Sequence, residues 1–161
     1  MTPALPVIAR VIIGGIFLIA GLAKIADPIR FFSTLLHFRL FSDAVLPFLA
    51  VYLPWLEFLL GLSLLTGILH RTSALMLTFL NVLFAAAILS VVMRGIEVDC
   101  GCFGLLADML QLPDTADMTA VARDLLFAFM CFYIYRARST RYSLEEYLKK
   151  KKESYPLGPK T

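Results

Sequence analysis

Four long apolar segments restrict what this chain of 161 residues can fold into. They cover residues 7–26, 44–69, 72–93 and 119–135, and Leu, Ile, Val, Phe and Ala dominate each of them. A helix needs about 20 such residues to cross the hydrocarbon core of a bilayer. Inside lipid, each segment must satisfy its own backbone hydrogen bonds, as a helix does. The sequence therefore predicts an all-α fold, a four-transmembrane-helix bundle.

The composition supports a small membrane protein and excludes several other classes. Hydrophobic residues make up 60% of the chain and charged residues only 17%, whereas a soluble domain carries about 25% charged residues. Disordered chains, disulfide-rich secreted scaffolds and nucleic-acid-binding domains do not have this composition, so we expect no nucleic-acid partner. Arg10 is the only basic residue near the start, and no polar stretch follows residues 21–23. We therefore expect the first segment to be retained rather than cleaved as a signal peptide.

Basic residues predict the orientation of the spans. Eight Lys or Arg residues follow Tyr135, whereas residues 94–118 contain one basic residue and five acidic residues. Basic segments stay on the cytoplasmic side of a bacterial inner membrane. We therefore predict a membrane domain at residues 1–136 and a basic cytoplasmic tail at residues 137–161, with the N-terminus also cytoplasmic. The loops after the first and third spans are then extracytoplasmic, and the lysines of the tail can contact anionic membrane lipid.

The first outer loop carries its own helical pattern. Within residues 29–41, polar residues recur at intervals of three and four, and phenylalanine and leucine fill the opposite face. The polar set is Arg30, Ser33, Thr34 and His37. This pattern is typical of an amphipathic helix in the membrane interface, so we predict such a helix with these four side chains on its wet face. We interpret His37 as part of that polar surface.

The strongest chemical signal lies in the second outer loop. Two of the three cysteines in the chain, Cys100 and Cys102, are separated only by Gly101 on the side where disulfides persist. A disulfide between such close residues needs a bent backbone, which glycine permits. A small ring of this kind should be strained, and strain favours exchange with an incoming thiolate. The residues that flank the pair are Asp99, Phe103 and Gly104.

Other interpretations of the two cysteines carry less weight. A zinc site needs four Cys or His ligands, but Cys131 falls in a predicted helix, His37 in another loop and His70 on the opposite face of the membrane. We therefore expect no metal site. A structural bridge that holds a tight turn is the second alternative. We interpret Cys131 as a buried, inert thiol.

Charged residues inside the apolar segments are costly and therefore informative. Arg10 and Lys24 lie on one stripe of the first span, with Gly14 and Gly21 between them. Small residues let helices approach closely, so we expect this stripe to face the bundle.

The second span carries Glu57 close to its middle. A carboxylate there must be paired or protonated, and we favour Arg123 or Lys24 as its partner over Arg94 and Arg10. Glu57 then either holds the helices together through an ion pair or hydrogen bond, or takes part in a quinone or proton path. In the third span, Asn81 is interpreted as a polar contact between helices.

Together these motifs resemble the MauE/DoxX group of redox-associated membrane proteins over residues 5–136. The motifs are the stripe from Arg10 to Lys24, the Pro54-x2-Glu57-x3-Gly61 pattern and the Cys-Gly-Cys-Phe-Gly run at residues 100–104, which points to the MauE branch. The resemblance implies an inner-membrane protein that acts with a periplasmic thioredoxin-like partner, as in the maturation of methylamine dehydrogenase, whose small subunit contains many disulfides. It also implies that Cys100 and Cys102 form the redox motif and that Arg10, Lys24 and Glu57 occupy the polar transmembrane positions of the family.

Thiol-disulfide exchange is the mechanism that we predict. A partner thiolate attacks one sulfur of the Cys100–Cys102 bridge, and the resulting mixed disulfide resolves when the second partner thiol attacks; reduction runs the same steps in reverse. Asp99 disfavours a thiolate at Cys100, which makes Cys102 the better leaving group. By analogy with other disulfide-forming membrane proteins, a quinone near Glu57 and Arg123 is the cofactor that this mechanism allows.

Two other functions stay open at this point. The chain can be a non-enzymatic membrane chaperone or assembly subunit in which the Cys100–Cys102 bridge is structural. It can also be a small transporter that uses Glu57 and Asn81, although four spans without an internal repeat would then require a homo-oligomer.

Overall fold

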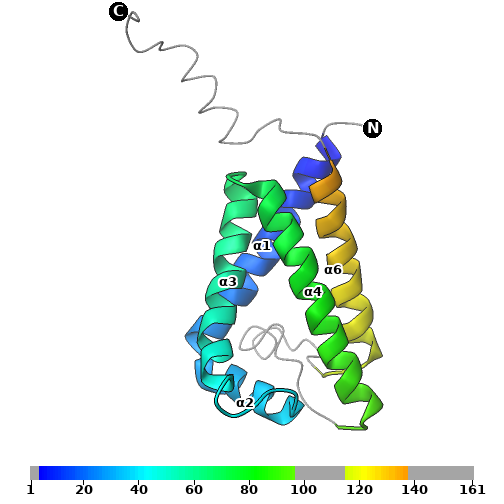
Figure 1. The fold of residues 1–161 in the computed structure, drawn as a ribbon. Helices are drawn as coiled ribbons and strands as arrows, with labels where there is room; N and C mark the ends of the chain where they lie inside the picture. The colour runs from blue at the N-terminus through cyan, green and yellow to red at the C-terminus, as the bar shows by residue number, and fades with distance from the viewer. Residues whose placement is uncertain (1–3, 97–114, 138–161) are drawn as a thin grey trace, which may run out of the picture.

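The computed structural model describes residues 4–96 and 115–137, and this part of the chain folds into helices (Figure 1). The helices are α1 (Ala4–Ala26), α2 (Pro28–Phe38), α3 (Leu46–Thr66), α4 (His70–Met93) and α6 (Met118–Arg136). All but α2 are long and apolar enough to cross a membrane. The predicted four-helix membrane bundle is therefore confirmed.

The turn between α3 and α4 explains why α3 ends earlier than predicted. The predicted span continued to residue 69, whereas α3 ends at Thr66. Gly67 has a φ of 76°, in the left-handed region that glycine adopts readily, and its backbone N–H donates to the carbonyl of Ser63. Leu69 also has a positive φ, of 52°, and α4 begins at the next residue.

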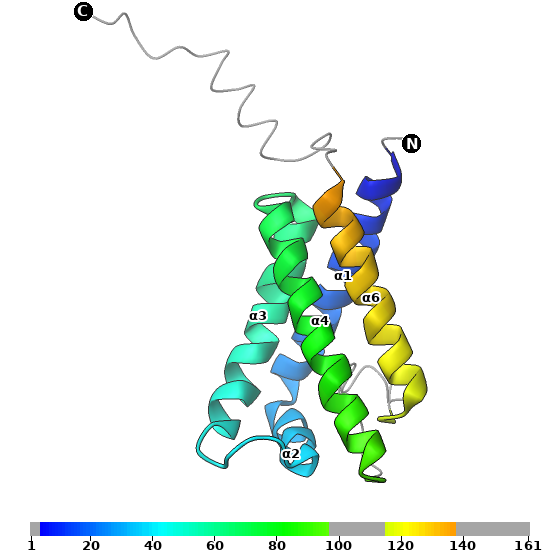
Figure 2. The ribbon, with the colours of Figure 1, turned by 45° about the vertical axis from the view of Figure 1, so that its right-hand side comes forward.

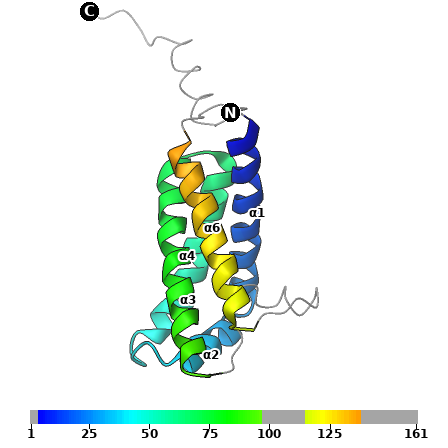
Figure 3. The same cartoon turned by 90° about the vertical axis from the view of Figure 1, so that its right-hand side faces the viewer.

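The bundle consists of two helix pairs. Helix α1 packs mainly on α3, and α4 packs mainly on α6, with less extensive contact between the pairs (Figure 2). Viewed from the side in Figure 3, α6 lies between α1 and α4. Helix α1 begins and α6 ends at one end of the bundle, and α2 lies at the other, which we call the α2 end (Figure 1).

Glycines bring the backbones of α1 and α3 into contact. A Cβ on Gly61 would lie only 2.6 Å from the backbone nitrogen of Leu18, and one on Gly21 would lie 2.7 Å from that of Phe58. Arg10 and Lys24, on the same stripe of α1 as Gly21, are both buried. The prediction that this stripe faces the bundle is therefore confirmed.

Helix α2 covers one end of the bundle and corrects one detail of the sequence analysis. Its first turn is capped by Asp27, whose carboxylate accepts a hydrogen bond from the backbone N–H of Arg30 at 3.1 Å. Thr34 was predicted on the wet face but is only 7% exposed, whereas Leu36 is 45% exposed. Thr34 shares a face with Phe31 and Phe38, and its hydroxyl can be buried because it donates to the carbonyl of Arg30 at 3.2 Å.

Candidate functional site

The predicted cysteine motif lies outside the described residues. Cys100 and Cys102, with the flanking positions Asp99, Gly101, Phe103 and Gly104, belong to residues 97–114. The structure does describe the two points from which this segment leaves and returns, Ile96 after α4 and Thr115 before α6.

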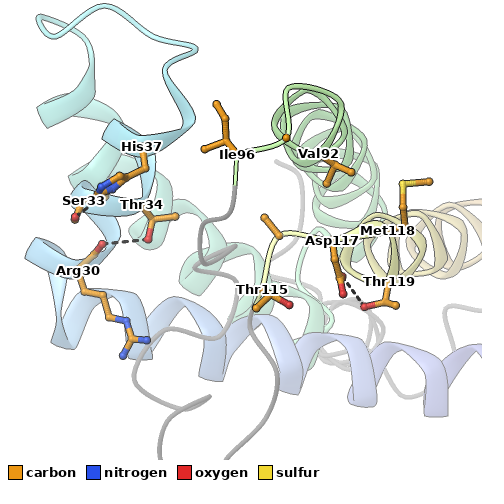
Figure 4. Close-up of a pocket in the computed structure, with 12 residues that line it drawn as sticks. Arg30, Ser33, Thr34, His37, Val92, Ile96, Thr115, Asp117, Met118 and Thr119 are labelled. Atoms are coloured by element: carbon orange, nitrogen blue, oxygen red, sulfur yellow. Dashed lines mark hydrogen bonds between the residues drawn. The ribbon is translucent and has the colours of Figure 1, made fainter.

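A large pocket lies at the α2 end, and we call it the α2 pocket (Figure 4). It has a volume of about 1080 Å³ and is lined by α2, by the end of α4 and by the start of α6. Its polar lining residues are Arg30, Ser33, Thr34, His37, Thr115, Asp117 and Thr119. Ile96 and Thr115 both line this pocket, so the cysteine-bearing segment is attached to its wall at both ends.

His37 is an exposed side chain on the α2 side of this pocket. Its Nδ1 lies 2.6 Å from the backbone carbonyl oxygen of Ser33 (Figure 4). A carbonyl oxygen only accepts hydrogen bonds, so Nδ1 carries the proton and donates it to this bond. The neutral ring then has its acceptor lone pair on Nε2.

Asp117 gives the α6 side of the pocket a negative charge. It is the N-cap of α6, and its Oδ1 accepts hydrogen bonds from the hydroxyl of Thr119 at 2.6 Å and the backbone N–H of Ala120 at 2.9 Å. These hydrogen bonds, first that from Thr119 and then that from Ala120, lower the pKa of Asp117 below the usual carboxyl value.

Arg94 joins α4 to α2 at the edge of this region. Its guanidinium donates to the carbonyl of Ser90 at 3.0 Å and to the carbonyl of Phe38, the last residue of α2. Arg94 was one of the weaker candidates for pairing with Glu57, and these bonds show what it does instead. It satisfies a carbonyl at the end of α2, as basic side chains commonly do at helix C-termini.

Glu57 forms a buried ion pair with Lys24. The Lys24 Nζ lies 2.6 Å from Oε2 and 2.9 Å from Oε1 of Glu57, and the two side chains are only 4% and 3% exposed. The ammonium also lies 5.2 Å from the ring centre of Phe31 and 5.3 Å from that of Phe84. Of the two partners that the sequence favoured for Glu57, the structure therefore places Lys24 against both carboxylate oxygens.

A second ion pair lies on α6. Arg123 Nη2 is 3.1 Å from Oδ1 of Asp124, and Asp124 is buried. Arg123 was a predicted partner of Glu57, whereas Asp124 was not among the predicted site residues. An acidic residue next to a basic one in an apolar segment was the available signal.

The two ion pairs line one small interior cavity. It has a volume of about 30 Å³, and Asn81 on α4 also lines it. Asn81 donates from Nδ2 to the carbonyl of Leu77 at 2.7 Å. Small-molecule sites usually have volumes of roughly 300–1,000 Å³, so this one cavity is too small for a quinone ring, and the predicted quinone near Glu57 and Arg123 stays a prediction.

The remaining predicted residues lie elsewhere in the bundle. Arg10 is buried near the start of α1, at the end opposite α2. Cys131 is a free thiol with no exposed surface, and it packs in the apolar core with Leu77 and Ile134. The prediction that Cys131 is buried is confirmed.

Comparison with known proteins identifies relatives of this chain. The family model described as methylamine utilisation protein MauE matches residues 2–137. The methylamine utilization protein MauE of Paracoccus denitrificans is 30% identical over 95 residues, which cover 58% of this chain and 51% of that protein. The aligned part of the chain thus spans about half the length of this curated relative. No solved structure gives a significant match. Because the family model covers every described helix, this multi-pass membrane protein belongs to the MauE family.

Proposed function

We propose that this protein exchanges disulfides through Cys100 and Cys102 with a thioredoxin-like partner on the extracytoplasmic side of the bacterial inner membrane. The exchange would support disulfide formation in an extracytoplasmic protein. The name of the Paracoccus relative links that protein to methylamine utilisation, and a methylamine dehydrogenase of the disulfide-rich kind is the client that we favour.

The position of the α2 pocket is the observation that carries this proposal. Ile96 lines the pocket and precedes Cys100 by four residues. An extended chain spans at most about 3.6 Å per residue, so four residues reach no farther than about 14 Å from the Cα of Ile96. A pocket of about 1080 Å³, lined by both polar and apolar residues, is thus within reach of the cysteine pair, and it supplies room for a partner segment.

The proposed chemistry transfers two electrons per cycle. A thiolate of the reduced partner attacks one sulfur of the Cys100–Cys102 disulfide, and the other sulfur leaves as a thiolate. The second partner thiolate then attacks the mixed disulfide. The partner becomes a disulfide, and Cys100 and Cys102 become two thiols after taking up two protons.

The reduced pair must then be reoxidised by a second redox partner. The sequence contains one further cysteine, and Cys131 is buried in the core without exposed surface. A relay between two cysteine pairs inside this chain therefore lacks its second pair. We propose that a second extracytoplasmic thiol protein resets Cys100 and Cys102, and the cycle runs in the reducing direction when the same steps are reversed.

The orientation of the bundle follows from the same proposal. We propose that the α2 end faces the extracytoplasmic side, because the tail after α6 is rich in Lys and Arg. Helix α1 begins and α6 ends at the opposite end, as this topology requires (Figure 1).

A trapping experiment in cells tests the proposed exchange. Each single variant, Cys100→Ala or Cys102→Ala, keeps one thiol that can attack the disulfide of an oxidised partner, but it lacks the second thiol that would release the partner as a dithiol. Acid quenching followed by alkylation should therefore preserve an adduct with an extracytoplasmic protein for at least one of them. The matched control is Cys131→Ala, which should form no adduct. If neither single variant captures a partner, and the double variant still supports maturation of the client, the redox proposal is wrong.

The same experiment separates the assembly-subunit alternative. The α2 pocket is large enough to hold a segment of a client without any redox step. In that case the double variant would still bind the client, and no adduct would form. The transporter alternative has little support in the described residues, because the cavity beside Glu57 and Asn81 has a volume of only about 30 Å³.

A further inference from the structure

The interior cavity lies where the two helix pairs meet. Lys24 and Glu57 reach it from α1 and α3, the first pair. Asn81 and Asp124 reach it from α4 and α6, the second pair. Arg123 on α6 is the fifth polar residue that lines it, and the remaining lining side chains are aromatic or aliphatic: Ile16, Phe17, Ala20, Phe84 and Phe127. Charged side chains from both helix pairs therefore lie around one point of the interface between the pairs.

These polar groups have more hydrogen-bonding capacity than their protein contacts use. A carboxylate offers about four lone-pair sites, and the Lys24 ammonium contacts each oxygen of Glu57 once. Asn81 uses one N–H for the carbonyl of Leu77, and its amide carries a second N–H and a carbonyl oxygen. Lys24, Glu57, Asn81 and Asp124 are each 4% exposed or less, so bulk solvent does not complete these interactions.

The size of the cavity indicates that water is the molecule that can form further hydrogen bonds with these polar groups. A single buried water needs a cavity of at least about 10–15 Å³ and two to four polar partners. The cavity measures about 30 Å³ and is lined by five polar side chains, so it has the volume and the partners for one or two waters. It is too small for a lipid or quinone headgroup.

We propose that this cavity is a water-binding site. One or two water molecules bridge the Lys24–Glu57 ion pair of the first helix pair to Asn81 and Asp124 of the second. The bridge adds hydrogen bonds to Glu57, Asn81 and Asp124 and joins the two helix pairs at their interface. This water site does not depend on the chemistry of Cys100 and Cys102.

Asn81 makes this site directly measurable because it is the only asparagine in the chain. A sample labelled with ¹⁵N at asparagine gives one side-chain amide signal. In deuterated bilayers, water-edited solid-state NMR reports whether water protons transfer magnetisation to that amide. We expect clear transfer in the wild-type protein, and its absence would overturn the proposal.

Two matched variants distinguish water in the cavity from water that reaches Asn81 by another route. Ala20 lines the cavity, so Ala20→Val fills it and should abolish the transfer. Ala86 is exposed on α4, and Ala86→Val makes the same chemical change away from the cavity, so transfer should persist. Unchanged transfer in Ala20→Val would contradict the proposal. If that variant does not fold, density for water beside Asn81 in a high-resolution structure of the wild-type protein decides, and an empty cavity there would overturn the proposal.

Discussion

Lys24 on α1 and Glu57 on α3 form an ion pair in the interior of the membrane bundle, with the Lys24 Nζ 2.6 Å from Oε2 of Glu57. Both side chains are buried, and the rings of Phe31 and Phe84 lie near the ammonium. Two charges are thus removed from water and satisfy one another. Such a pair adds little net free energy to the folded state. Loss of one partner, however, carries a large penalty, because the other charge is then left buried and unpaired.

Removal of Lys24 alone should therefore destabilise the protein. Lys24→Met leaves the Glu57 carboxylate buried without its ammonium, and breaking a buried pair in this way costs about 3–5 kcal/mol. The double variant with Glu57→Met replaces both charges with apolar side chains and should recover most of that loss. Thermal unfolding in detergent measures both effects. A single variant as stable as the wild type would contradict a buried ion pair at this position.

The contact between α1 and α3 leads to a second prediction, with a control glycine on α1. A Cβ on Gly61 would lie 2.6 Å from the backbone nitrogen of Leu18, whereas a Cβ on Gly15 would have no neighbour within 4 Å. Gly61→Ala forces the backbones apart and should cost about 1–3 kcal/mol. Gly15→Ala should change the free energy of unfolding by no more than about 1 kcal/mol. Equal effects of the two substitutions would show that the backbones are not in contact.

Asp117 should make stability dependent on pH in the acidic range. Hydrogen bonds from Thr119 and the backbone of Ala120 lower its pKa in the folded state. The folded protein therefore binds the proton less tightly than the unfolded chain does. The resulting stabilisation is fully present above the unfolded carboxyl pKa of about 3.9 and is lost as the pH falls from there through the lower folded pKa.

Comparison with Asp117→Asn isolates this contribution. Asparagine retains a capping oxygen but has no carboxyl group to titrate. The difference in unfolding midpoint between wild type and variant should be constant near neutral pH and should shrink as the pH falls below about 4. A difference that grew on acidification would have the wrong sign for a lowered pKa.

The proposed orientation predicts which loops a membrane-impermeant maleimide reaches from outside the inner membrane. In an otherwise cysteine-free chain, Ser42→Cys and Thr115→Cys lie at the α2 end, and Leu69→Cys lies in the turn between α3 and α4 at the opposite end. All three positions are exposed. The first two should react in intact spheroplasts, and the third only after lysis. The reverse pattern would invert the topology.

Much of the bundle could be predicted because membrane helices depend on local properties of the sequence. Apolar length predicted the four spans, and periodicity predicted the buried faces of Lys24 on α1 and Glu57 on α3. The wet face of α2 was predicted less well, because Thr34 satisfies its hydroxyl within the helix and can then be buried beside Phe38. Hydropathy treats that hydroxyl as exposed and does not account for the internal bond.

The polar cluster could be predicted only in part. The pattern on each helix indicates which residues face inward. Which charged side chains come into contact depends on how far the four helices are shifted relative to one another along the bundle axis. Lys24 and Arg123 were therefore equivalent candidates for Glu57 in the sequence, and the tertiary structure pairs Arg123 with Asp124 on its own helix. The α2 pocket had no signal in the sequence, because it arises where α2 meets two segment ends that are distant along the chain.

The central claim is that Cys100 and Cys102 exchange disulfides, and a thiol count tests it most directly. The Cys131→Ala protein, oxidised and placed in lipid vesicles, is mixed with a reduced thioredoxin-like protein, quenched with acid and alkylated for mass spectrometry. We predict that the pair gains two thiols for each disulfide formed in the partner. A pair that keeps its original thiol count with excess reduced partner, while small thiols still reduce it, would contradict the claim.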